Sequence, residues 1–387
     1  MNVRKPLELY IHIPFCAKKC DYCDFLSGPA SEMVSHGYVE QLIEEIKCEG
    51  ASCQGYGVVT IFIGGGTPSI LRAGEIQAIM DAVRKSFFVE ADAEITIEAN
   101  PGTVTREKLA AYQACGINRI SIGLQSANDQ ELKNLGRIHT YDEFLKTYQR
   151  VRLAGFSNVS VDLMSALPGQ TLASWKSTLK KVAMLKPEHI SAYSLMIEEG
   201  TPFYKRYHER PELLPGEDVE REMYYTTKAF LREQGYERYE ISNYARPGRE
   251  CSHNIGYWTG VEYLGLGLGA SSYFRGCRFR NEANLDKYRK IRMQDGAGEV
   301  NEKLHLDRAQ LTDKEKMEEF MFLGLRLMRG VSGSEFLRRF DQNMWNVYGD
   351  VLRKLEENHL IVVESPVVRL SDFGIDISNY VLSEFLL

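Results

Sequence analysis

The sequence has no long uninterrupted apolar run and no excess of positive charge. None of its apolar stretches approaches the roughly 18 residues that a membrane-spanning helix needs. It has 47 Lys and Arg against 53 Asp and Glu, a net charge of −6, which offers no basic stripe for nucleic acid. The first strand pattern begins almost directly after Met1 and leaves no room for a signal peptide. We therefore expect a cytoplasmic protein that does not bind nucleic acid.

Cysteine is sparse outside one short segment. Three of the eight cysteines, Cys16, Cys20 and Cys23, lie on one predicted loop, separated by three and by two residues. The other five are scattered, and in a reducing compartment we expect free thiols. Three thiolates on one loop can hold three irons of a [4Fe–4S] cluster and leave the fourth iron open to chelate S-adenosylmethionine (SAM). The alternative is a structural zinc site, which usually takes paired CxxC motifs and a fourth ligand.

The first 240 residues or so alternate between strand and helix patterns. Short β-branched strands are predicted at 7–13, 58–63, 95–99, 119–123, 158–162 and 190–196, and helices at 32–47, 73–87, 106–114, 141–154, 172–185 and 219–234. The strands are apolar at consecutive positions, as expected for parallel strands buried on both faces. Six β–α units predict an α/β fold with a partial (β/α)6 TIM-type barrel. A doubly wound sheet is the alternative.

The chain divides into three predicted parts. Residues 1–243 form the barrel domain, 244–310 a Gly- and aromatic-rich connector, and 311–387 a C-terminal domain. The last part shows helical patterns at 312–329, 333–340 and 342–358, two short strands at 360–364 and 367–370, and a final helix at 374–387. Helices followed by a hairpin predict a mostly helical, winged-helix-like domain. Because it has no basic recognition helix, we expect a packing or lid role.

Polar and glycine residues gather where the predicted barrel strands end. The turn from Gly64 to Pro68 lets the backbone approach a ligand and offers N–H donors, although a plain β–α turn would look the same. Glu98 ends the next strand and suits ribose hydroxyls, or the dipole of the following helix. The carboxyl ends of parallel strands meet at one edge. The sequence therefore predicts a ligand site there.

Two further motifs lie in the connector. Residues 265–270 match a dinucleotide fingerprint superficially, but they lie outside a β–α–β unit, so we interpret them as a tightly packed strand or turn. The segment from His253 to Trp258 combines an imidazole with two aromatic rings. Histidine is a common axial haem ligand, and aromatic faces suit a porphyrin. Taken alone, such a histidine is more often a loop residue packed into the core.

Together these motifs resemble the oxygen-independent coproporphyrinogen III oxidase family of the radical-SAM superfamily. The resemblance spans nearly the whole chain and includes the cysteine triad, the Gly64–Pro68 turn, residues 121–126 and 162–170, and the C-terminal helices. True oxidases carry a fourth cysteine two residues after the third and an N-terminal extension. This chain has Phe25 at that place, and fifteen residues precede Cys16. Its HNxxYW motif, which starts at His253, matches the haem-chaperone branch instead.

The resemblance implies a role for each matching residue. Cys16, Cys20 and Cys23 would ligate the cluster, and His253 would bind haem. The residues that fall where the oxidase contacts SAM are Tyr10, Gly65, Gly66, Thr67, Glu98, Gln125, Arg137, Asp162 and Met196.

The function that the resemblance implies is that of a haem chaperone rather than an enzyme. Such a protein would carry a [4Fe–4S] cluster and SAM, bind haem, and hand it to haem-dependent proteins, respiratory enzymes at the membrane above all. It is compatible with a peripheral membrane association and with a dimer. One alternative is coproporphyrinogen III dehydrogenase, which would use a SAM-derived radical for oxidative decarboxylation of two propionates. The other is a radical-SAM enzyme with a different substrate.

Overall fold

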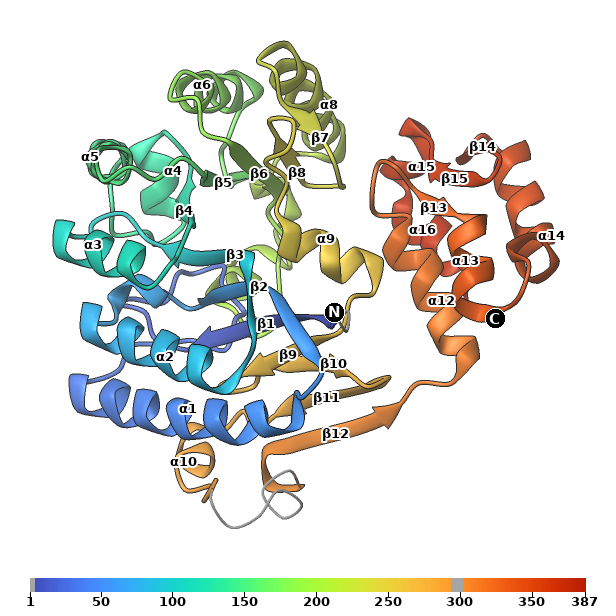
Figure 1. The fold of residues 1–387 in the computed structure, drawn as a ribbon. Coiled ribbons are helices and arrows are strands. Elements are labelled where there is room, and N and C mark those ends of the chain that lie inside the picture. The colour runs from blue at the N-terminus through green and yellow to red at the C-terminus, as the bar shows by residue number, and fades with distance from the viewer. Residues whose placement is uncertain (1–3, 294–301) are drawn as a thin grey trace.

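The computed structural model describes residues 4–293 and 302–387, and its centre is a twelve-stranded sheet (Figure 1). The strand order is β12-β11-β10-β9-β1-β2-β3-β4-β5-β6-β8-β7. Its six parallel strands are β1 (Lys5–Ile13), β2 (Tyr56–Gly65), β3 (Val89–Ala99), β4 (Arg119–Gln125), β5 (Val159–Ser165) and β6 (His189–Ser194). A doubly wound sheet reverses its strand order, whereas these strands follow chain order throughout. The predicted open barrel is therefore confirmed.

Helices follow the parallel strands and cover one side of the sheet (Figure 1). Ser and Thr side chains cap the first turns of several, among them Ser31, Thr105 and Thr171, which fix where each helix begins. The helices of this part are α1 (Glu32–Ser52), η1 (Pro68–Ile70), α2 (Ala73–Ser86), α3 (Arg106–Ala114), α4 (Asp129–Asn134), α5 (Tyr141–Leu153), α6 (Leu172–Ala183), α7 (Pro202–Tyr207), η2 (Pro211–Leu213) and α8 (Glu217–Glu233).

Across the parts of the chain that the structure describes, we find no helix with the length and apolar character needed to cross a membrane.

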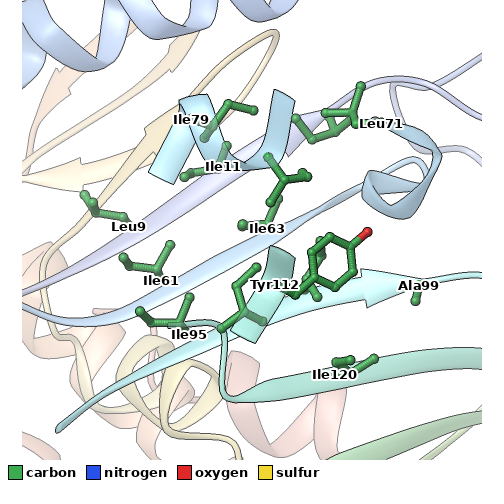
Figure 2. Close-up of a cluster of buried hydrophobic side chains, with 14 of the residues drawn as sticks. Leu9, Ile11, Ile61, Ile63, Leu71, Ile79, Ile95, Ala99, Tyr112 and Ile120 are labelled. Atoms are coloured by element: carbon green, nitrogen blue, oxygen red, sulfur yellow. The ribbon is translucent and has the colours of Figure 1, made fainter. Parts of the chain in front are cut away.

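The barrel strands alternate between apolar and polar side chains, which differs from the consecutive apolar positions expected from the sequence. Leu9, Ile61 and Ile95 lie in one buried cluster together with Ile79 of α2 and Tyr112 of α3 (Figure 2). Successive side chains of a strand point to opposite faces, so the positions between them face the barrel interior. That inner face carries buried polar groups, including those of Glu8, Thr60, Thr96 and Arg119. A polar interior is the lining that a ligand site requires.

The predicted connector folds largely as an extension of the same sheet. β9 (Tyr263–Leu266) pairs in parallel with β1, and β10 (Ser271–Phe274), β11 (Cys277–Asn281) and β12 (His305–Gln310) continue antiparallel. A Cβ on Gly265 would lie 2.3 Å from the Ser271 carbonyl oxygen, which confirms that the glycines at 265–270 serve close packing. The other elements are β7 (Glu237–Arg238), β8 (Asn243–Ala245), α9 (Ser252–Thr259) and α10 (Leu285–Tyr288). Residues 294–301 of the predicted connector lie outside the described residues.

The C-terminal domain has its own hydrophobic core and a winged-helix arrangement. Its helices are α12 (Asp313–Gly324), α13 (Gly333–Phe340) and α14 (Met344–Glu357), and its sheet has the order β13-β15-β14. The strands are β13 (Val331–Ser332), β14 (Ile361–Glu364) and β15 (Val367–Leu370). The predicted last helix is two short ones, α15 (Asp372–Asp376) and α16 (Ser378–Ser383), because the backbone of Ile377 leaves the helical region.

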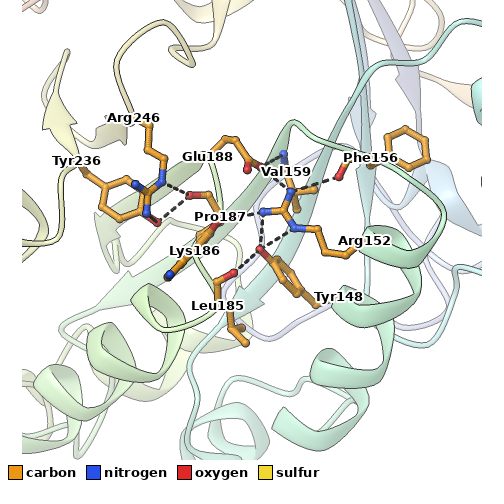
Figure 3. Close-up of polar contacts among 10 residues, drawn as sticks. All are labelled: Tyr148, Arg152, Phe156, Val159, Leu185, Lys186, Pro187, Glu188, Tyr236 and Arg246. Atoms are coloured by element: carbon orange, nitrogen blue, oxygen red, sulfur yellow. Dashed lines mark hydrogen bonds and ion pairs between the residues drawn. The ribbon is translucent and has the colours of Figure 1, made fainter.

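A network of hydrogen bonds and one ion pair holds the segment that leads into β6 in place (Figure 3). The Arg152 guanidinium pairs with the Glu188 carboxylate at 2.7 Å and donates to the Phe156 and Lys186 carbonyls. The Tyr236 hydroxyl donates to the Pro187 carbonyl at 2.7 Å. These contacts join α5, β6 and the end of α8 at the amino ends of the strands. The carboxyl ends are left free for the site.

Candidate functional site

The three predicted cluster cysteines lie on one loop directly after β1. The loop is tied down at its start, where the Cys16 amide donates to the Gly28 carbonyl at 3.0 Å, and at its end, where the Cys23 amide donates to the Cys20 carbonyl at 3.2 Å. All three thiols are free and partly exposed. Burial raises the pKa of the Cys23 thiol, which the nearby Lys19 ammonium partly offsets.

All three cysteines line one cavity of about 390 Å³ at the carboxyl ends of the strands. Eight of the nine residues predicted to contact SAM line the same cavity: Gly65, Gly66, Thr67, Glu98, Gln125, Arg137, Asp162 and Met196. The ninth, Tyr10, lines an adjacent cavity of about 490 Å³, and Gly65 and Glu98 line both. The structure therefore brings together residues that lie 180 positions apart in the sequence.

The glycine turn holds the end of β2 against the base of the cysteine loop. The Gly66 amide donates to the Ile13 carbonyl at 2.8 Å, and the Thr67 amide donates to the Phe15 carbonyl at 2.8 Å. The Gly65 amide donates to the Glu98 carboxylate at 3.1 Å. These three N–H groups are therefore occupied within the protein. The sequence suggested free N–H donors here, whereas the structure shows that the glycines serve the close approach of two backbones.

Two half-buried carboxylates, those of Glu98 and Asp162, face this cavity from β3 and β5. Burial, together with the charge of Asp162, raises the pKa of Glu98 to about 8. Burial also raises the pKa of Asp162, although hydroxyl donors from Ser191 and Ser121 act in the opposite direction. The Ser191 hydroxyl donates to Asp162 at 2.8 Å. Carboxylates in this setting are suited to accept hydrogen bonds from a ligand's hydroxyl or amino groups.

Arg137 and Met196 both reach the cavity. The Arg137 guanidinium lies 3.6 Å from the Cys20 sulfur and donates to the Asn100 side chain at 2.8 Å. Met196 lies just beyond β6 and is 70% exposed at the rim.

The residues present fit a [4Fe–4S] cluster with SAM beside it. The Thr67 hydroxyl donates to the Cys16 sulfur at 3.5 Å, so two of the three sulfurs already accept a hydrogen bond. Within residues 4–293 and 302–387, no three His, Cys, Asp or Glu side chains, the three cysteines included, are grouped closely enough to hold one metal ion. When bound, such a cluster supplies an electron to SAM. The polar residues of the adjoining strand ends would hold the SAM molecule.

The structure places His253 away from both cavity linings. It lies in α9 rather than on a loop and is 1% exposed. Its Nδ1 lies 2.6 Å from the Thr60 hydroxyl and its Nε2 lies 3.0 Å from the Tyr257 hydroxyl. Its ring stacks on Phe62 at 5.2 Å between centroids. Burial lowers the pKa of His253 to about 3, so the imidazole is neutral.

Several residues that hold α9 in the barrel were missed in the sequence. The Glu94 carboxylate accepts from the Ser252 and His253 amides and so caps the helix. Glu8 faces Gly256 so closely that a Cβ there would lie 1.9 Å from its carboxylate. The available signal was the polar residue at every second position of these strands, which marks an inward-facing side chain.

Comparison with known proteins shows the same two-part organisation. Residues 10–182 match the model of the radical SAM superfamily, and residues 311–377 match that of the HemN C-terminal domain.

The curated relatives are similar over most or all of the chain. The chain is 37% identical over 385 residues to heme chaperone HemW of Lactococcus lactis, which covers 100% of this chain and 98% of the relative. It is 44% identical over 266 residues to heme chaperone HemW of Escherichia coli, a match that covers 68% of this chain and 69% of the relative. It is 34% identical over 348 residues to the mitochondrial radical S-adenosyl methionine domain-containing protein 1 of Mus musculus, a match that covers 88% of this chain and 78% of the relative.

Among solved structures, coproporphyrinogen III oxidase (HemN) from Escherichia coli, a radical-SAM enzyme, matches with a TM-score of 0.85 at 25% identity. The match covers 99% of this chain and 90% of that one. The cysteine loop, the strand-end cavity and the near-complete similarity to these relatives agree, and we conclude that the chain belongs to the HemW family within the radical-SAM superfamily.

Proposed function

We propose that the protein is a haem chaperone that binds haem and transfers it to haem-dependent proteins, respiratory enzymes in particular. The observation that carries the proposal is the cavity of about 490 Å³ beside the cluster cavity, in a chain whose relatives are named heme chaperones. Tyr10, Tyr257, Trp258 and Tyr263 give it aromatic walls. Its volume falls in the range of about 300–1,000 Å³ typical of ligand sites. Flat aromatic faces suit the large apolar plane of a porphyrin.

The HNxxYW helix is the haem-binding element in this proposal. Tyr257 and Trp258 of α9 line the cavity, and His253 holds the same helix from inside the barrel. A [4Fe–4S] cluster on Cys16, Cys20 and Cys23 and a SAM molecule would occupy the adjacent cavity. The proposed place of action is the cytoplasm. Association with a membrane surface and dimerisation are compatible with it.

Coproporphyrinogen III dehydrogenase is the second candidate, and the structural match to HemN favours it. Against it stands Phe25, which occupies the position of the oxidase's fourth cysteine and lines both cavities. An oxidase must bind the porphyrinogen and turn it over, whereas a chaperone must hold haem and release it unchanged.

The test is to purify the full-length protein without oxygen and offer it both ligands. We expect stoichiometric haem binding, loading of an apo-haem protein, and no conversion of coproporphyrinogen III under reducing conditions. His253→Ala should bind haem more weakly or with an altered spectrum and should fail to load the acceptor. Multiple turnovers of coproporphyrinogen without haem binding would overturn the chaperone proposal and support the dehydrogenase.

A further inference from the structure

The identity of the iron ligand is a separate question, and it rests on the proposed haem site. A ligand atom must reach the cavity and have a lone pair free for iron. The neighbouring side chains that can supply such an atom are two histidines, His12 and His253, and three tyrosines, Tyr10, Tyr257 and Tyr263.

Neither histidine presents a free nitrogen. His12 Nε2 lies 2.9 Å from the Leu26 carbonyl, which can only accept, so Nε2 carries the proton. Its Nδ1 then accepts from the Tyr10 hydroxyl at 3.1 Å. His253 is 1% exposed, and both of its nitrogens are hydrogen-bonded. Iron could bind either imidazole only after a buried hydrogen bond was broken.

Tyr257 lines the cavity and is partly exposed, and it lies one helical turn after His253 on α9. The Thr60 hydroxyl bonds to both Glu8 and His253 Nδ1. If Thr60 donates to Glu8, it accepts from Nδ1–H, and Nε2 is left to accept from the Tyr257 hydroxyl. In that arrangement the Tyr257 hydroxyl donates to Nε2, 3.0 Å away, and its oxygen keeps a lone pair free.

We propose that the Tyr257 oxygen is the iron ligand and that His253 is its positioning residue. Tyrosine is an established haem ligand, and ferric iron prefers an anionic oxygen donor. On ligation the phenol O–H bond breaks and the Fe–O bond forms. The proton is released to the solvent, His253 stays neutral, and the iron stays ferric, so no electron is transferred.

The other two tyrosines serve as matched controls. Tyr10 also lines this cavity and donates to a histidine, but it lies on β1, outside the HNxxYW helix to which haem binding is assigned. The Tyr263 oxygen accepts from the Arg278 guanidinium at 3.0 Å, and no histidine among the described residues hydrogen-bonds to it. Tyr10→Phe and Tyr263→Phe should therefore leave the iron ligand unchanged.

The experiment titrates the full-length protein and its variants with ferric haem, and in parallel with metal-free protoporphyrin IX. The wild type should show a phenolate-to-iron charge-transfer band, with the matching phenolate modes in the resonance Raman spectrum. Tyr257→Phe should lose both while binding metal-free protoporphyrin as the wild type does. Because the porphyrin without iron reports only packing, this comparison separates a lost ligand from a damaged cavity.

Two further variants test the roles directly. Tyr257→His should still bind haem but show an imidazole spectrum. His253→Gln, which keeps a hydrogen-bond partner for Tyr257, should retain the phenolate band, whereas His253→Ala should weaken it. Stoichiometric haem binding with an unchanged spectrum in Tyr257→Phe would overturn this inference and leave the chaperone proposal standing. No haem binding by the folded wild type would overturn both.

Discussion

Gly66→Ala tests whether the glycine turn exists to let two backbones touch. An alanine Cβ at this position would lie 2.7 Å from the Phe15 carbonyl oxygen and 3.0 Å from the Ile13 carbonyl oxygen. Both atoms belong to the backbone that leads into Cys16, so no flexible side chain can move aside. Forcing extra volume into a packed site typically costs about 1–3 kcal/mol. The strain should be relieved by displacing the cysteine loop, so we expect lower stability and weaker iron retention together.

The assay is anaerobic denaturant unfolding followed by circular dichroism, with iron and sulfide measured on the same samples. Gly74→Ala is the matched control, because a Cβ there meets nothing within 4 Å and lies inside α2. Helix propensity predicts that this control is neutral or more stable by up to about 1 kcal/mol. Equal unfolding midpoints and equal iron content in Gly66→Ala and the wild type would refute the close-approach argument.

Three other outcomes follow from the same site. Replacing Cys16, Cys20 and Cys23 together with Ser should abolish the brown colour of the cluster and its content of about four irons and four sulfides per chain. The control Cys115→Ser should keep the colour and the iron and sulfide content. Stoichiometric zinc without sulfide would contradict the cluster. The pKa of Glu98 is raised to about 8, so its carboxyl group is protonated below that pH and cannot then accept through both oxygens. The SAM affinity measured by calorimetry should therefore rise by up to about tenfold per pH unit towards pH 8 and then level off. Glu98→Gln should remove this pH dependence. Because Glu98 lines both cavities, SAM should change haem affinity by the same factor as haem changes SAM affinity, and independent affinities would disprove that coupling.

Local patterns were enough to predict the barrel domain. Its strands and helices could be placed because each β–α unit carries its own hydrophobic period and capping residues. The cysteine loop could be predicted equally well, because the short spacing of Cys16, Cys20 and Cys23 places three thiols on one loop. The position of the glycine turn was predicted as well, but its free N–H donors were not confirmed, because these groups bond to the backbone before Cys16 and to Glu98.

The strands added at the edge of the sheet could not be predicted from the sequence in the same way. Strand β9 pairs with β1 across more than 250 residues of sequence, and the glycine-rich composition of the segment from 263 to 281 resembles that of a loop. Hydrogen bonds between strands so far apart depend on where the whole sheet ends, which no local window contains.

The HNxxYW motif shows most clearly what the sequence determined and what only the tertiary structure could decide. The sequence alone supplied a histidine and two aromatic rings and so indicated haem. Only the fold shows that His253 points inward to Thr60, a residue 193 positions away, while Tyr257 lines the cavity. The physical reason is the helical repeat of α9, which places His253 and Tyr257 one turn apart on the same face, so the buried imidazole meets the hydroxyl of the cavity-lining tyrosine at 3.0 Å.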